Sequence, residues 1–184
     1  DVYKREFLAL RAIDTNLVVC PDWKGRLEDV ERPKFFDGYV ALDIGGVDPH
    51  GILFGYWDYE KQQLVIEDEL LLRDNENTEV IAARVKEVEA RLWGTTKWDG
   101  TLRAAQEARG YSPITAGALV NTTQPYLRVC DSGGPKLELK VDGVCFLPTE
   151  KTNKWEQVNT VNVLFRQDKI KISPRCRNLA RHVK

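Results

Sequence analysis

Two aspartates, each directly after a short apolar run, are the residues of this chain whose type and spacing could do chemistry. Asp43 follows residues 39–42, Asp131 follows residues 126–130, and a glycine pair comes within three residues of each. Such runs with turn signals behind them predict buried central strands, and open α/β sheets bind ligands at the C-terminal ends of their strands. Two carboxylates on neighbouring strands repel each other unless a cation lies between them, so the pair predicts a divalent-metal site.

The composition is that of an ordinary globular domain, with 184 residues, of which 42% are hydrophobic and 30% are charged. No apolar stretch reaches the roughly 20 residues that a membrane helix needs. The four cysteines are scattered and only two histidines are present, which argues against a zinc site and favours a reducing, intracellular compartment. The sequence contains no methionine, which we interpret as the mark of an interior piece of a larger protein.

The apolar periodicity predicts the elements that must position the two acids. Strands are expected at 38–44, 52–57 and 64–72 without a helix between them, which predicts an antiparallel meander. A helix capped by Thr78 and ended by Gly94 follows, and its apolar face would cover the sheet. Residues 95–125 are interpreted as an irregular insertion. The second half is expected to hold a strand at 126–131, a short helix at about 135–140, a strand at 144–147, a helix at 154–166, an edge strand at 169–172 and a basic helix from 175.

This order of elements, with acids on the first and fourth strands, is the layout of the RNase H-like fold. That is an α/β fold whose central mixed sheet, antiparallel over its first three strands and parallel afterwards, is flanked by helices. Its first and fourth strands lie side by side, and their acids hold two Mg²⁺ or Mn²⁺ ions that clamp the attacking and leaving oxygens of a phosphodiester. Asp43 would bridge the two ions, and Asp131 would hold one of them.

Several short segments carry a likeness to a known family, at residues 3–7, 41–49, 129–136, 142–144, 148–154 and 170–176. On these residues the chain resembles the nuclease domain of the large terminase subunit of tailed bacteriophages. The resemblance implies a metal-dependent endonuclease that cuts double-stranded concatemeric DNA for genome packaging. It places the nuclease domain at 37–184 and makes residues 1–36 a lead-in from a preceding ATPase domain.

The resemblance also implies partners and a place of action. The partners are double-stranded DNA, the ATPase domain, the portal and the small terminase subunit, with no membrane involved. The place is the cytoplasm of the infected bacterial host, transiently on the viral procapsid.

The third acid of the family falls beyond Lys184, so the resemblance implies a nuclease domain that is cut short and weakly active. Glu69, on the third strand, is the nearest local substitute, although a surface strand glutamate is the simpler interpretation. Asp48 and His50 flank a proline in the turn after the first strand, where such residues are routine. We therefore interpret Asp48 and His50 as solvated turn residues.

DNA contacts are expected from the basic C-terminal third, where eleven Lys and Arg after residue 130 stand against six Asp and Glu, a net charge of +5. Lys136, Lys151 and Lys154 are the candidates, and such contacts to phosphate are blind to sequence. On charge alone, an ordinary solvated surface is the simpler interpretation. Trp155 and Phe165 are expected to pack in the core.

Two other functions stay open. The Asp-Ile-Gly-Gly at 43–46 also opens the ATP-binding fold of actin and sugar kinases, and ATP binding without DNA cleavage would favour that function. A piece that lacks a third acid could instead be a non-catalytic DNA-docking module of the packaging motor. DNA binding without Mn²⁺-dependent nicking would favour the docking module.

Overall fold

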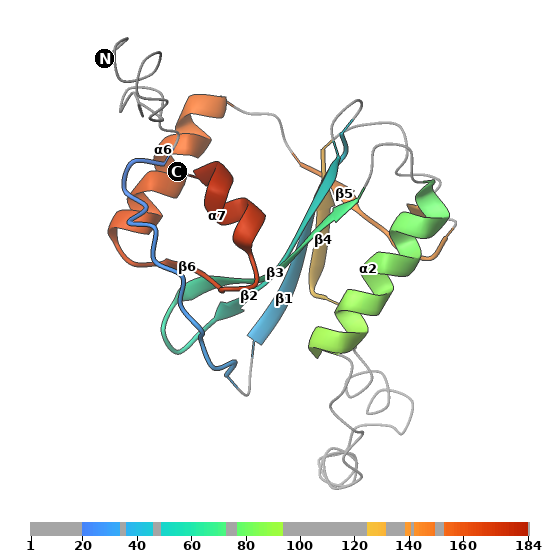
Figure 1. Ribbon diagram of the computed structural model, residues 1–184, viewed down its shortest axis with the longest axis horizontal. Coiled ribbons are helices and arrows are strands. Elements are labelled where there is room, and N and C mark those ends of the chain that lie inside the picture. The colour runs from blue at the N-terminus through green and yellow to red at the C-terminus, as the bar shows by residue number, and fades with distance from the viewer. Residues whose placement is uncertain are drawn as a thin grey trace, which may run out of the picture.

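The computed structural model describes residues 20–33, 36–45, 49–72, 77–93, 125–131, 139–140, 142–149 and 153–183. These residues form one mixed sheet with helices on both of its faces (Figure 1). The strands are β1 (Phe36–Asp43), β2 (His50–Asp58), β3 (Gln63–Leu72), β4 (Leu127–Cys130), β5 (Leu147–Pro148) and β6 (Ile170–Ile172). The helices are α2 (Thr78–Trp93), α6 (Lys154–Arg166) and α7 (Arg177–Val183).

The strand order confirms the fold class predicted from the sequence. The six strands lie in the order β5-β4-β1-β2-β3-β6. The β1-β2-β3 meander is antiparallel, whereas β4 runs parallel to β1, β5 to β4, and β6 to β3. The first and fourth strands are therefore neighbours near the middle of the sheet, as the RNase H-like layout requires.

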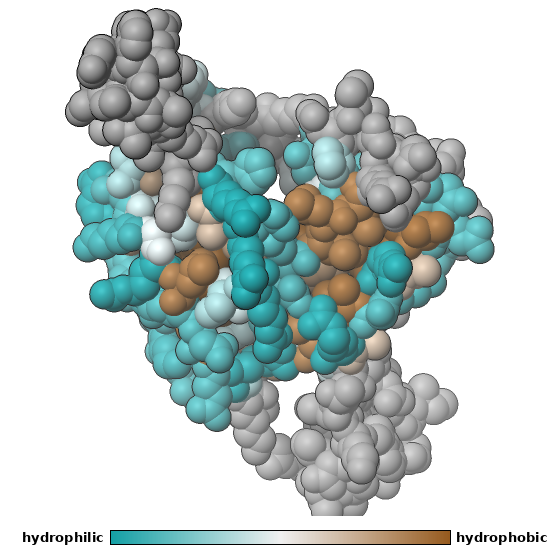
Figure 2. All heavy atoms as spheres, in the orientation of Figure 1, coloured by the Kyte–Doolittle hydropathy of each residue, from teal (hydrophilic) through white to brown (hydrophobic). Residues whose placement is uncertain are grey.

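Helix α2 covers one face of the sheet with its apolar side. Its residues Ile81, Val85, Val88 and Leu92 recur at helical spacing and are all buried. They pack against alternate residues of β1 and β2, and Figure 2 shows hydrophobic residues gathered where α2 faces the sheet. The sheet contributes Val40, Leu42, Ile52, Phe54 and Leu72 to this core.

Helices α6 and α7 lie on the opposite side of the sheet from α2 (Figure 1). An extended arm, residues 20–33, runs beside β6, where the Glu28 amide donates to the Ile172 carbonyl at 2.9 Å. At the other end of the arm, Arg32 Nη1 donates to the Leu92 carbonyl at the end of α2 at 2.6 Å. The arm therefore ties the β6 edge to α2. None of the described helices is both long and apolar enough to cross a lipid bilayer.

The structure corrects four details of the sequence analysis. His50 is not a solvated turn residue, because it begins β2 and is 5% exposed. Asn77, not Thr78, caps α2, because its Oδ1 accepts from the Val80 amide at 2.9 Å. The strand expected at 144–147 is limited to Leu147–Pro148, although Val144 is buried against the core. Trp155 lies on the outer side of α6 and is 74% exposed instead of buried. The expected insertion at 95–125 lies almost wholly outside the described residues, as does most of the expected short helix at about 135–140.

Candidate functional site

The register of β1 and β4 brings the two aspartates side by side. The parallel pairing matches Leu42 with Cys130, so Asp43 and Asp131 are the next residues of the two strands. The Asp131 amide donates to the Leu42 carbonyl at 3.4 Å, which extends the ladder to the acids. Neighbouring strands of a sheet are about 4.8 Å apart, so the backbones that carry the two carboxyl groups are close.

Strand alternation directs both acids away from the core. Leu42 and Cys130 are 3% and 1% exposed, and both belong to the core under α2. Successive side chains of a strand point to opposite faces, so Asp43 and Asp131 face the side of the sheet on which α7 lies. Asp43 is exposed there. The two carboxylates thus lie on the same face of the sheet, at the C-terminal ends of two neighbouring strands.

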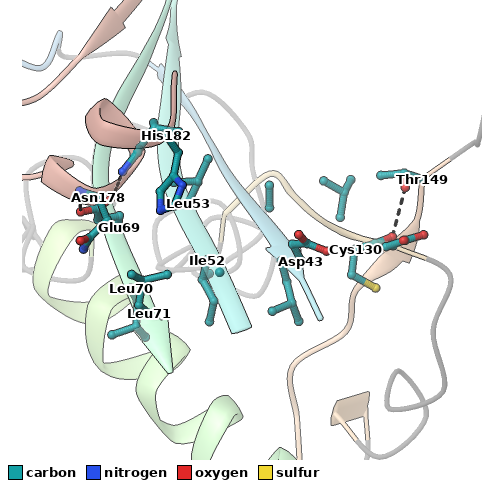
Figure 3. A pocket seen from close by; sticks show the side chains of 16 residues that line it. Asp43, Ile52, Leu53, Glu69, Leu70, Leu71, Cys130, Thr149, Asn178 and His182 are labelled. Atoms are coloured by element: carbon teal, nitrogen blue, oxygen red, sulfur yellow. Dashed lines mark hydrogen bonds between the residues drawn. The ribbon is translucent and has the colours of Figure 1, made fainter. Parts of the chain in front are cut away.

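A cleft of about 430 Å³ on this face contains both acids. Its apolar floor is made by strand residues that include Ala41, Leu53 and Val129. On the far side the cleft is bounded by α7, from which His182 projects beside Leu53 (Figure 3). Asp43 lies on the other side of the cleft in the same view. A molecule bound here would contact acids on one side and α7 on the other.

Glu69, the suggested third acid, lines the cleft from β3 and holds the start of α7. Its Oε1 accepts from the Asn178 amide at 2.6 Å and its Oε2 from the Leu179 amide at 2.7 Å. Both carboxylate oxygens therefore satisfy backbone amides in the first turn of a helix, where negative charge is favourable. This role accounts for an acid at position 69 without any metal.

Replacing Glu69 by alanine (Glu69→Ala) is expected to lower the free energy of unfolding by about 2 kcal/mol, because two charge-assisted hydrogen bonds to the start of α7 are lost. Urea unfolding measures this change. The matched control is Glu60→Ala, which removes an exposed acid in the turn between β2 and β3. Equal stabilities of the two variants would contradict the capping role.

Burial of its inner side fixes α7 further. Cys176, directly before the helix, is fully buried and its Sγ donates to the Ile66 carbonyl at 3.6 Å. Burial raises the pKa of this thiol to about 12, with the nearby Glu69 and Asp68 carboxylates adding to the effect, so the thiol stays protonated and can donate. Ala180 is also buried. The wall of the cleft that α7 forms is therefore anchored at its beginning and along its inner side.

A buried ion pair fixes β4, the short strand that ends at Asp131. Arg128 Nε and Nη2 donate to the two carboxylate oxygens of Glu89 on α2, at 2.6 and 2.7 Å. The two side chains are only 9% and 5% exposed. A bidentate arginine–carboxylate pair has defined geometry as well as charge, so it sets where β4 lies against α2. This pair was not predictable from the sequence, because a glutamate inside an amphipathic helix resembles a surface residue.

Of the predicted DNA contacts, Lys136 and Lys151 lie outside the described residues, and Lys154 begins α6 with its side chain also outside them. Within the described part of the chain, no group of three or more His, Cys, Asp or Glu side chains is arranged to hold a metal ion. The carboxylates of Asp43 and Asp131 are nevertheless the hard oxygen donors that Mg²⁺ and Mn²⁺ prefer, and Mg²⁺ needs only one or two of them beside water and phosphate. The donor set therefore fits a divalent cation that a substrate helps to bind.

Helix α7 contributes three residues to the cleft that were not predicted from the sequence, namely Asn178, Leu179 and His182. Their spacing of i, i+1 and i+4 does define one side of a helix. However, only the tertiary structure shows that this side faces the two acids.

The sheet order and the acid pair define the class of this protein as an RNase H-like α/β domain. No protein-family model and no curated protein matches the sequence. Among solved structures, the chain is similar to the nuclease domain of the phage P22 large terminase, with a TM-score of 0.55 and 13% identity over 83% of this chain and 71% of that one.

The chain is also similar to the large terminase of the thermophilic bacteriophage D6E, with a TM-score of 0.61 and 10% identity over 89% of this chain. It spans 35% of the D6E chain. At these identities the likeness establishes the fold, and the resemblance to terminase nuclease domains that the sequence predicts is confirmed at that level.

Proposed function

We propose that this chain is the nuclease domain of a viral DNA-packaging terminase, and that it cuts double-stranded DNA with the help of divalent metal ions. The observation that carries the proposal is the register of β1 and β4, which sets Asp43 and Asp131 side by side on the open face of the sheet. The likeness of the fold to terminase nuclease domains supports it. An ATPase domain of the same protein, the portal and the small subunit would be its partners in the bacterial cytoplasm.

Asp43 and Asp131 would hold the metal ions, since both present carboxylate oxygens to the same cleft. When bound, divalent ions supply Lewis-acid stabilisation of phosphate charge and lower the pKa of water. The chain itself positions these ligands through the β1–β4 ladder and the Arg128–Glu89 pair.

The test is nicking of supercoiled plasmid DNA by the purified protein, with MnCl₂ or with EDTA. The proposal expects conversion of the plasmid to open-circular and linear forms in MnCl₂ and none in EDTA. DNA binding without cleavage in Mg²⁺ or Mn²⁺ would support the non-catalytic docking alternative instead. Equal cleavage in EDTA would contradict metal dependence.

Asp43→Asn is expected to make the metal-free protein more stable by about 0.2–1 kcal/mol, because like charges on neighbouring strand positions repel each other. In MnCl₂ at a hundredfold excess over its Kd the order should reverse, since metal binding stabilises only the wild type, by about 2.7 kcal/mol. Urea unfolding in EDTA and in MnCl₂ measures both differences.

The control for this experiment is Asp37→Asn, at the opposite end of β1, where the carboxylate accepts the Tyr59 hydroxyl. It should change stability by the same amount with and without the metal. A stabilisation by MnCl₂ that is the same for Asp43→Asn and wild type would show that the ion binds elsewhere.

A further inference from the structure

The walls of the cleft differ in what they offer to a phosphodiester. Three carboxylates line it, those of Asp43, Glu69 and Asp131, and they repel phosphate unless a cation lies between. The other polar residues that line it are Thr149, Asn178 and His182. The hydroxyl of Thr149 donates to the Cys130 carbonyl at 3.4 Å. Among the described lining residues, the side-chain donors left for a phosphate are therefore those of Asn178 and His182, both on α7.

These two donors belong to a continuous strip with an arginine. Asn178, Arg181 and His182 stand at i, i+3 and i+4, so their side chains are neighbours on one side of α7. Arg181 and His182 are both exposed. Figure 3 shows His182 and Asn178 on the side of the cleft opposite Asp43. Asn178 and His182 therefore face the same cleft as the acid pair, and Arg181 lies next to them on the exposed surface of α7.

The charge around α7 suits a polyanion. Residues 173–183 include three arginines and no Asp or Glu. None of these arginines makes a side-chain hydrogen bond or ion pair with any residue that the structure describes, in contrast to Arg128 and Arg166, which are paired. Unpaired exposed arginines beside a cleft are available for phosphate oxygens, which they bind with charge-assisted hydrogen bonds.

We propose that the α7 strip, Asn178, Arg181 and His182, holds the DNA phosphate backbone across the cleft from Asp43 and Asp131. This inference rests on the proposed function and adds the protein groups that bind the substrate directly. Asn178 and His182 would donate hydrogen bonds to phosphate oxygens at the cleft, and Arg181 would contact a phosphate at its rim. Because Glu69 and Cys176 hold α7 in place, the strip is a fixed support that positions the backbone over the acids.

The binding test uses a short fluorescein-labelled DNA duplex in EDTA, with anisotropy measured over a series of KCl concentrations. Arg181→Gln should bind several-fold more weakly than wild type, and the slope of log K against log[KCl] should become shallower by about 0.9, the value for one phosphate contact. The matched control is Arg84→Gln, which removes one exposed cation from α2 on the opposite face of the sheet. Its slope should equal that of wild type.

The kinetic test uses plasmid nicking in MnCl₂. His182→Ala should raise KM about fivefold with kcat unchanged, because a hydrogen bond made equally in the ground and transition states is lost. His182→Gln keeps an N–H donor and should retain the wild-type KM, which a purely structural role of His182 would not predict. Thermal unfolding of each variant checks that α7 stays docked.

The outcomes separate this inference from the proposed function. Wild-type affinity, salt slope and KM in both Arg181→Gln and His182→Ala would overturn the α7 strip, while loss of nicking in Asp43→Asn would still support the nuclease. A wild-type protein that binds no DNA would overturn both proposals. If the protein binds DNA without nicking it, the salt slope of Arg181→Gln alone decides the inference.

Discussion

Asp43→Asn is expected to reduce Mn²⁺-dependent nicking of supercoiled DNA by at least about a hundredfold. A metal ion in such a site contributes several kcal/mol to transition-state stabilisation, and each 1.4 kcal/mol or so corresponds to a tenfold change in rate. Asparagine keeps the size and one oxygen of the side chain but removes its charge, so the loss reports on metal binding and not on packing. Initial rates of nicking at saturating MnCl₂ measure the effect.

Asp37→Asn is the matched control, because it makes the same change on the same strand at the end away from the cleft. Its nicking rate should stay within about twofold of the wild type, since ordinary surface changes leave stability nearly unaltered. If Asp43→Asn and Asp37→Asn nick DNA at similar rates, Asp43 is not part of the catalytic site.

Glu89→Ala is expected to lower the free energy of unfolding by about 3–5 kcal/mol, which is the cost of leaving a buried charge without its partner. The partner is Arg128, which is 9% exposed and would lose both of its bonds to the carboxylate. Urea denaturation provides the measurement. Glu87→Ala, two residues earlier on the same helix, removes an acid from an exposed pair with Arg84 and should cost less than about 1 kcal/mol.

A double variant separates the charge from the packing at this position. Replacing both partners, with Glu89→Leu and Arg128→Met, should restore most of the stability that Glu89→Ala loses, because apolar residues often replace a buried pair without loss. The pair lies on the α2 side of β4, away from the cleft, so the double variant should keep its nicking activity. A Glu89→Ala variant as stable as Glu87→Ala would contradict the burial of the pair.

Much of the fold could be predicted because local signals agreed with the tertiary structure. The bounds of α6, Lys154–Arg166, were predictable from its apolar spacing, and Asn153 caps it by accepting from the Trp155 amide. The pairing of the first and fourth strands was expected because the order of elements resembles the RNase H-like fold, in which these two strands are neighbours. Asp43 and Asp131 could be identified because an acid at the end of an apolar strand breaks the local pattern.

The errors have a common physical cause, which is that burial depends on neighbours that the sequence does not specify. Trp155 looked like a core residue by type, yet α6 turns it to solvent. The burial of Glu89 against Arg128 was not predicted, because a glutamate in an amphipathic helix is usually exposed. Asn178 and His182 share one side of a predicted helix, but only the docking of α7 against β3 places that side in the cleft.

The central claim is that Asp43 and Asp131 bind the same divalent cation. A crystal of the protein soaked in MnCl₂, with anomalous scattering from manganese, tests it directly. We predict an anomalous peak within bonding distance of carboxylate oxygens from both residues, and its loss in crystals of Asp43→Asn. A manganese peak found only elsewhere on the protein would contradict the account. Carboxyl groups of Asp43 and Asp131 that point away from each other would also contradict it.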